Sequence, residues 1–287
     1  MAEMNDRGQL LLLAGIFLAV LFVALALLVN TAIYTDNVAT RGGDSAGEAL
    51  EYQSSVVDSV GGLIDAENAD GDHGTRDEIR NAVKAGTETI DSIHTQNHRR
   101  RGVDTNISTG NISAETTTDG TLLRRTNPGE IQEWNVSNAS GVRAFDIGLE
   151  AGSVGSDPLN ITLDSTTLFV YKDAGDVVVA QDSMANVTCR ANATGTVRFD
   201  VTDGRLGGDR CQIEWPDING EVGFENNGSV NGTYNVTVAA DVDPATFDPD
   251  IDAKRALYSI DELEIRIDTP QLRYETTVRI APGEPDV

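Results

Sequence analysis

Hydrophobic and polar residues follow three different patterns along this chain. From Leu10 to Val29, twenty consecutive residues carry no charge. As a helix this segment would be about 30 Å long, the thickness of the hydrocarbon core of a bilayer. Between Gly47 and Arg101, apolar residues recur every three or four positions, which predicts amphipathic helices. After about Thr105 the segments become short, β-branched and alternating, which predicts strands.

Two helices are predicted between the apolar segment and the strands. Gly42-Gly43 marks a break after the apolar segment, and AENADGDHG is a polar link between the helices. The second helix begins after Thr75, a candidate N-cap, and has acids in its first turn. The apolar stripe of the first helix is Ala49, Tyr52, Val56, Val60 and Leu63. The stripe of the second is Ile79, Val83, Ile90 and Ile93.

The rest of the chain predicts a β-rich domain. Turn residues separate the segments VRAFDIGLE, TTLFVYKD, DVVVAQD, TVRFDVTD, TYNVTVAAD, ELEIRID and LRYETTVRI. Strands at this spacing are typical of an antiparallel β-sandwich. We therefore expect an α+β fold: a long N-terminal hydrophobic helix, a short helical stalk and an antiparallel β-sandwich-like extracellular domain. Cys189 and Cys211 predict one structural disulfide if this domain lies outside the cell.

The composition is strongly acidic. The formal net charge of −25 argues against a nucleic-acid partner, because binding phosphates needs clustered Lys and Arg. Of the 21 basic residues, only Lys84, Lys172 and Lys254 are lysines. Acidic excess with few lysines is typical of halophilic proteins, for which a Debye length of about 3 Å in molar salt screens the self-repulsion. The frequent Val, Ile and Leu argue against a disordered acidic chain.

The residues before the apolar segment help to decide whether it is a cleaved signal peptide or a retained membrane helix. A cleaved secretory signal would have a shorter apolar region and a small-residue cleavage site, and no clear A-x-A site follows here. The leader MAEMNDRG ends in Arg7-Gly8, and Gln9 opens the apolar run. A short charged leader, a basic residue, Gly, Gln and a long apolar helix resemble an archaeal type IV pilin-like precursor, and more specifically a group of haloarchaeal pilin-like membrane proteins.

This resemblance implies a processing event and a set of partners. A prepilin peptidase would cut after Gly8, so that the mature chain begins at Gln9. The apolar helix would hold the subunit in membrane lipid and, with the assembly machinery, pack against other pilin-like subunits. Many pilins carry Glu at the fifth mature position, where this chain has Leu13. A carboxylate in the span is costly unless it pairs with a neighbouring subunit, so its absence favours a minor subunit or a plain anchored protein over a bulk filament subunit.

Acceptor motifs for N-glycosylation are concentrated after residue 100. With 19 Asn and 42 Ser or Thr among 287 residues, chance predicts about three Asn-x-Ser/Thr motifs. Ten occur, and none of the six Asn before residue 100 begins one. The excess indicates an exported domain, although Thr-rich strands account for part of it. The candidate acceptors are Asn106, Asn111, Asn135, Asn138, Asn160, Asn186, Asn192, Asn227, Asn231 and Asn235.

Few residues suggest catalysis or metal binding. GGDSAGE around Ser45 is similar to a Gly-Asp-Ser hydrolase motif, but it lacks the preceding strand and a later His. The Cys pair alone cannot hold zinc. The run from His98 to Arg101 is a charged helix end, with anionic lipid or an acidic partner as the alternative. Two acidic loops offer oxygen ligands to a cation, but neither fits the twelve-residue calcium loop. Their weak candidate ligands are Asn68, Asp70 and Asp72, and Asp241, Asp243, Asp248, Asp250 and Asp252.

These patterns divide the chain into a leader (1–8), a transmembrane or pilin-type helix (9–35), a helical stalk (36–101) and an extracellular β-rich domain (102–287). We expect a single-pass cell-membrane protein with a cytoplasmic N-terminus and no cofactor or enzymatic activity. It would act as a type IV pilin-like, minor subunit in filament or pseudopilus assembly or adhesion. The alternative is a membrane-anchored surface glycoprotein with a ligand-binding or envelope role. An envelope enzyme that uses carboxylates is the third and least favoured hypothesis.

Overall fold

The computed structural model describes residues 46–71, 73–226 and 228–285. The processing residues Arg7, Gly8 and Gln9 and the apolar segment from Leu10 to Val29 lie outside the described residues, so their roles stay predictions. Among the helices that are described, none combines the length and the apolar character needed to cross a membrane.

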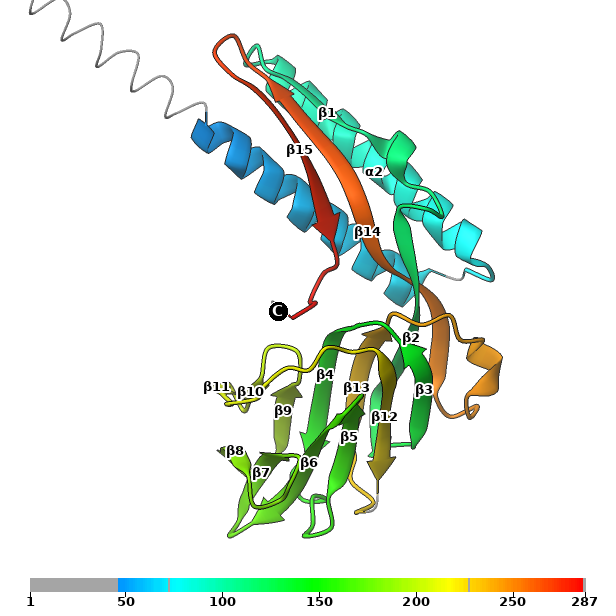
Figure 1. The fold of residues 1–287 in the computed structure, drawn as a ribbon, viewed down its shortest axis with the longest axis vertical. Helices are drawn as coiled ribbons and strands as arrows, with labels where there is room; N and C mark the ends of the chain where they lie inside the picture. The colour runs from blue at the N-terminus through cyan, green and yellow to red at the C-terminus, as the bar shows by residue number, and fades with distance from the viewer. Residues whose placement is uncertain (1–45, 72, 227, 286–287) are drawn as a thin grey trace, which may run out of the picture.

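The described chain is mostly antiparallel β-sheet with two helices, which confirms an α+β fold (Figure 1). Its elements form two bodies. The first, which we call the helical layer, contains the helix at 46–70, α2 (Arg76–Arg99), β1 (Asp104–Ile107), β15 (Arg273–Ile280) and the second half of β14 (Asp252–Asp268). The second, the sandwich, contains β2 (Thr117–Glu130), β3 (Trp134–Ala139), β4 (Val142–Glu150), β5 (Leu159–Leu163), β6 (Thr166–Asp173), β7 (Asp176–Gln181), β8 (Val187–Asn192), β9 (Thr196–Asp200), β10 (Arg205–Leu206), β11 (Asp209–Arg210), β12 (Gly220–Asn226) and β13 (Asn231–Val238).

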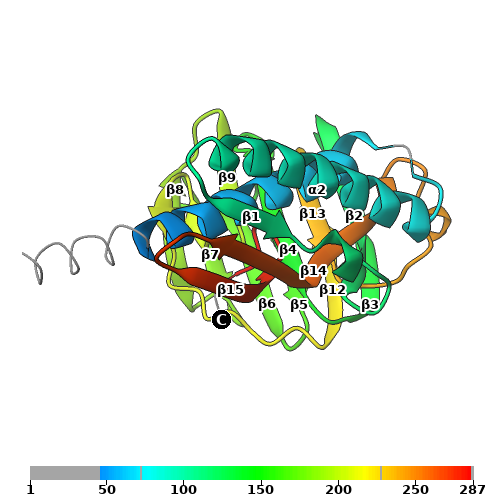
Figure 2. The same cartoon turned by 90° about the horizontal axis from the view of Figure 1, so that it is seen from above.

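In the helical layer, both helices cover one face of β1, β14 and β15 (Figure 2). Alternate residues of β14, namely Leu263, Ile265 and Ile267, are fully buried against the helices, because successive side chains of a strand point to opposite faces. The predicted stripe of the first helix is confirmed from Ala49 to Val60, and the next fully buried residue is Ile64 instead of Leu63, which is only partly buried.

The start of α2 is as predicted, whereas the end of its apolar stripe is not. Thr75 and Glu78 form a capping box, in which the Thr75 hydroxyl accepts from the Glu78 amide and the Glu78 carboxylate accepts from the Thr75 amide. The prediction that Ile93 belongs to the buried stripe is wrong, because its side chain is 53% exposed. The last turns of α2 contact the first helix through His94 and His98, whose rings pack edge-on against Tyr52.

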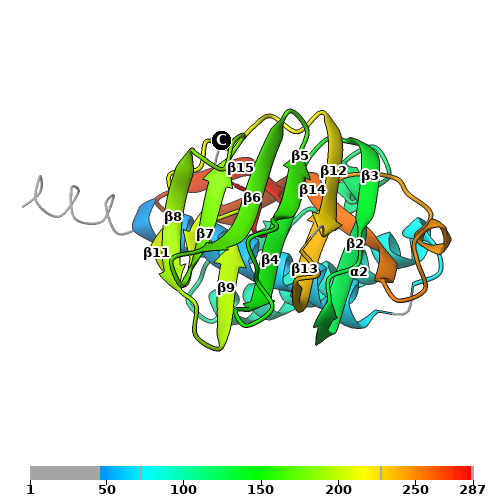
Figure 3. The same cartoon turned by 90° about the horizontal axis from the view of Figure 1, so that it is seen from below.

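The sandwich consists of two antiparallel sheets that pack face to face (Figure 3). One sheet has the order β3-β12-β5-β6-β7-β8, and the other runs β14-β2-β13-β4-β9-β10-β11. Their facing side chains form one core, to which the first sheet contributes Ile161 and Phe224 and the second contributes Phe145 and Tyr234. Phe224 lies edge-on to both Phe145 and Tyr234, so aromatic contacts join the two sheets.

The strand β14 belongs to both bodies. Its first half pairs with β2, and its second half pairs with β1 and β15. The register with β2 shifts just after Leu257. There the side chain of Asn68 donates to the Leu257 carbonyl (3.1 Å) and accepts from the Leu257 amide (2.9 Å). Asn68, a candidate cation ligand in the sequence, therefore takes the place of a neighbouring strand and satisfies backbone groups that would otherwise be buried without partners.

Arg143 of β4 joins the sandwich to the helical layer. Its fully buried guanidinium donates to Asp65 of the first helix (2.8 Å), to the Pro282 carbonyl (2.9 Å) and to the Leu257 carbonyl (3.0 Å). It also lies over the ring of Tyr258, 5.7 Å from the ring centre. In the described residues, the helices of the predicted stalk thus share a hydrophobic core and hydrogen bonds with the C-terminal strands. The core that contains these helices continues beyond residue 101 into the strands.

Candidate functional site

The predicted glycan acceptors lie at the surface. Nine of the ten fall in the described part of the chain, Asn227 being the exception, and none of the nine is buried. Most occupy outward positions of strands whose neighbouring residues point into a core. The exposed acceptors are Asn106, Asn135, Asn138, Asn186, Asn192 and Asn235, and the half-buried ones are Asn111, Asn160 and Asn231. An accessible side-chain amide is the structural requirement for this modification.

Two acceptors share the outer face of the six-stranded sheet with a group of acids. Asn135 of β3 donates to Glu221, and Asn160 of β5 donates to Glu225 (3.4 Å), both on the intervening β12. Gly223 lies between these two acids, and a Cβ there would come within 2.5 Å of the Trp134 carbonyl. The result is a hollow of about 230 Å³ that Glu133 also lines. Its three carboxylates make it unfavourable for an anionic ligand.

A second hollow, of about 520 Å³, lies on the outer face of the other sheet. Arg124 and Arg125 of β2, Arg198 of β9 and Asp146 of β4 line it, together with the acceptor Asn235 of β13. The sequence analysis missed this group because its members come from four strands, and only the Arg124-Arg125 pair is visible as a local motif.

Two of the three arginines in this hollow form ion pairs with aspartates. Arg198 bonds to Asp146 (2.6 Å), and Arg124 bonds to Asp252 (2.8 Å). Burial raises the pKa of Asp146 above its ordinary value, although the hydrogen bond from Arg198 opposes the shift. Among the described residues, Arg125 has no acid within ion-pair distance, and its Nε is buried without a hydrogen-bond partner. Arg125 is therefore the arginine in the hollow whose charge is not already paired with an acid.

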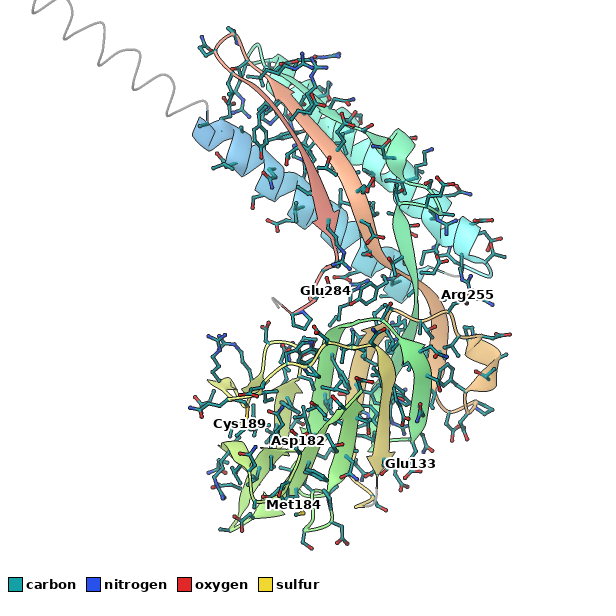
Figure 4. All side chains as sticks on the ribbon, viewed as in Figure 1. Glu133, Asp182, Met184, Cys189, Arg255 and Glu284 are labelled. Carbon is teal, nitrogen blue, oxygen red and sulfur yellow. A yellow bond between two sulfur atoms is a disulfide. The ribbon has the colours of Figure 1, made fainter. Side chains whose placement is uncertain are left out.

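The predicted disulfide between Cys189 and Cys211 is confirmed. Cys189 lies on β8, the edge strand of the six-stranded sheet, and Cys211 directly follows β11, the edge strand of the other sheet (Figure 4). The bond therefore connects the two sheets at one side of the sandwich. Such a bond persists in oxidising compartments, in agreement with an extracellular domain.

The acidic loop after β13 uses its carboxylates for local contacts. Asp241 forms an ion pair with Arg76 of α2, and Asp243 accepts a hydrogen bond at the start of the short helix η2 (Pro244–Thr246). Asp248 accepts from the backbone amide of Asp250 (2.9 Å). Within the described ranges, no three His, Cys, Asp or Glu side chains are placed to hold a metal ion. The loop instead connects the sandwich to α2.

One family model matches the chain. Residues 4–135 match a family described as "Family of unknown function (DUF7261)". The match covers less than half of the chain. It includes residues 4–8 of the leader, the apolar segment, both helices, β1 and β2, and it ends at the start of β3. No curated protein and no solved structure matches the chain significantly. The matched family supplies no activity, ligand or partner for the N-terminal part.

Proposed function

We propose that this protein is a type IV pilin-like, minor subunit that is held in the cell membrane by its N-terminal apolar helix and displays the sandwich outside the cell. The observation that carries the proposal is the surface position of all nine described acceptors, on both bodies of the molecule. The disulfide that joins the two sheets supports the same location. The role would be assembly or adhesion through protein contacts.

The position of the first helix supports this orientation. The first helix, blue in Figure 1, begins at the end of the helical layer that is far from the sandwich. An anchor that precedes this helix would leave the sandwich as the distal part, with both outer sheet faces accessible. Leu50, near the start of the same helix, is 61% exposed, which leaves an apolar side chain for a neighbouring subunit.

The second candidate function is a membrane-anchored surface glycoprotein that binds an anionic ligand. The hollow lined by Arg124, Arg125 and Arg198 favours it, because an arginine without an acid partner suits a carboxylate or sulfate. Both hypotheses include the membrane anchor and the glycans. Only the pilin-like hypothesis requires cleavage after Gly8 and assembly with other subunits.

The experiment that separates the two is intact-mass and N-terminal peptide mass spectrometry on the protein from its native membrane. We expect a mature start at Gln9 and glycan masses on acceptors after residue 100. Replacing Gly8 with Val should block processing. Gly47→Val is the matched control, since a Cβ at Gly47 meets nothing within 4 Å.

Electron microscopy of the cell surface completes the test. Filaments or tip structures that contain the wild-type and Gly47→Val chains, but not the Gly8→Val chain, would support a pilin-like subunit. An intact leader at full occupancy would overturn it and leave the anchored glycoprotein. A chain that carries no glycan on any acceptor and is found inside the cell would overturn both hypotheses.

A further inference from the structure

A third hollow lies between the two helices, next to the start of the helix at 46–70 and the end of α2. It measures about 250 Å³. The first helix contributes Glu48, Glu51 and Tyr52, and α2 contributes His94 and His98. It is separate from the glycan acceptors and from both hollows of the sandwich.

The two histidines have the spacing of metal ligands on a helix. His94 and His98 are four residues apart and therefore lie on one face of α2, with ring centres 6.2 Å apart. Two imidazoles in this arrangement on a helix are a recurring zinc-binding pair. The ring of Tyr52 packs edge-on against both, at 5.4 Å and 5.2 Å between ring centres.

One nitrogen of this pair is buried without a partner. His98 is only 8% exposed, and its Nδ1 makes no hydrogen bond within the described part of the chain. The nearest acid is Glu48, whose Oε1 is 4.0 Å from this Nδ1. That separation is too long for a hydrogen bond. It is close to the roughly 3.4 Å between two ligand atoms that a tetrahedral zinc ion holds at about 2.1 Å.

The acidic side chains around the hollow favour a cation. Glu48 and Glu51 supply negative charge, and Arg101, which is 3.7 Å from Glu48, opposes it. A bound ion would compete with Arg101 for the Glu48 carboxylate. Because Arg101 is 63% exposed, its side chain can turn to solvent at little cost.

We propose that the hollow between the helices is a binding site for a divalent first-row transition metal such as Zn²⁺, with His94, His98 and Glu48 as ligands. As placed in the structure, these three groups do not converge on one point. Binding closes the gap between His98 and Glu48 by about half an ångström and turns the His94 ring toward the same point. Imidazole and carboxylate suit Zn²⁺, Ni²⁺ and Cu²⁺. The ion would clamp the start of the first helix to the end of α2.

The test is titration of the metal-depleted full-length protein in detergent micelles with Zn²⁺, followed by isothermal titration calorimetry, and with Co²⁺, followed by its visible absorption. We expect one Zn²⁺ per chain at the tight site and a Co²⁺ spectrum that intensifies as the ion leaves octahedral water. His98→Gln and His94→Gln should each weaken binding at least about tenfold, because changes to groups behind the ligands alone cost about 10–100-fold. The matched control is His73→Gln, since His73 lies outside the hollow and bonds to Glu67 (2.9 Å).

The outcomes are distinct. Loss of the tight site in both α2 variants but not in His73→Gln supports the proposal. Equal binding by all four proteins would place the ion elsewhere on the acidic surface and overturn it, as would the absence of any site tighter than about 0.1 mM, an affinity of about −5.5 kcal/mol. If a histidine variant fails to fold by circular dichroism, Glu48→Gln replaces it, with the same tenfold criterion.

Discussion

Replacing Arg143 with Met should uncouple the helical layer from the sandwich. The guanidinium is fully buried and donates to Asp65 and to two backbone carbonyls, those of Leu257 and Pro282. Met keeps much of the apolar stem but removes every donor. The Pro282 carbonyl is left without a partner, at about 1–3 kcal/mol, whereas the Leu257 carbonyl still accepts from Asn68. Asp65 adds little, because its side chain is 54% exposed and can be hydrated. The expected loss is about 2–4 kcal/mol, from the unpaired Pro282 carbonyl together with the lost contact between the guanidinium and the Tyr258 ring.

Arg198→Met is the matched control. Arg198 also donates to a single aspartate, Asp146, at 2.6 Å, but its side chain is 70% exposed. An exposed pair contributes at most about 1 kcal/mol. Urea unfolding followed by far-UV circular dichroism, with all proteins in the same molar salt, gives the two free energies. In thermal scans the Arg143 variant should melt on the order of 10 °C lower, at about 2–4 °C per kcal/mol for a chain of this size.

The number of steps in the unfolding transition is a second measurement for Arg143→Met. Because the two bodies have separate cores, loss of the joint should split unfolding into two steps. The reasoning is refuted if Arg143→Met costs no more than Arg198→Met and still unfolds in one step. In that case the shared strand β14, and not the buried guanidinium, would hold the bodies together.

Three further outcomes are expected. Replacing both Cys189 and Cys211 with Ser should lower the free energy of unfolding by about 3 kcal/mol, the loop-closure value for residues 22 apart, and reduction of the wild type should reproduce the loss. Asn68→Ala removes two buried hydrogen bonds to one backbone residue and should cost about 2–4 kcal/mol in urea unfolding, whereas a loss below 1 kcal/mol would contradict the pairing. Burial lowers the pKa of His94 and His98, so the unfolded chain binds more protons than the folded chain just below pH 6.5, and stability falls as the pH falls through that region. The His94→Gln/His98→Gln double variant should lose this part of the pH slope, measured as melting temperature between pH 7 and pH 5 without metal.

Local elements were predictable from the sequence. VRAFDIGLE coincides with β4 and TTLFVYKD with β6, because each alternates between a core and a solvent face. Thr75 as an N-cap and the acids of the first turn predicted the start of α2, because capping is a local hydrogen-bond pattern. The cysteine pair could be matched without geometry, since the chain has no other cysteines.

Contacts between distant parts of the chain were not predictable in the same way. The sequence predicted a helical stalk because an amphipathic stripe indicates that one face of a helix is buried. The stripe does not identify the segment that packs against this face. Here that segment is the second half of β14 and β15, about two hundred residues later. The sequence did not single out Arg143, because its partners Asp65, Leu257 and Pro282 are all distant from it in the chain. The hollow with Arg125 and the hollow with His98 likewise depend on which elements become neighbours.

The position of β14 dictates when this protein can fold. The chain is synthesised from its N-terminus, so the helices emerge long before the strand that covers them. The hydrogen bonds between the Asn68 side chain and the backbone of Leu257 can form only after a further 189 residues have been made. Until then the apolar stripes of both helices stay open to water and to other chains. The last strands are therefore the last to complete the fold, and a chain that stops before β14 would leave both bodies incomplete and prone to aggregate.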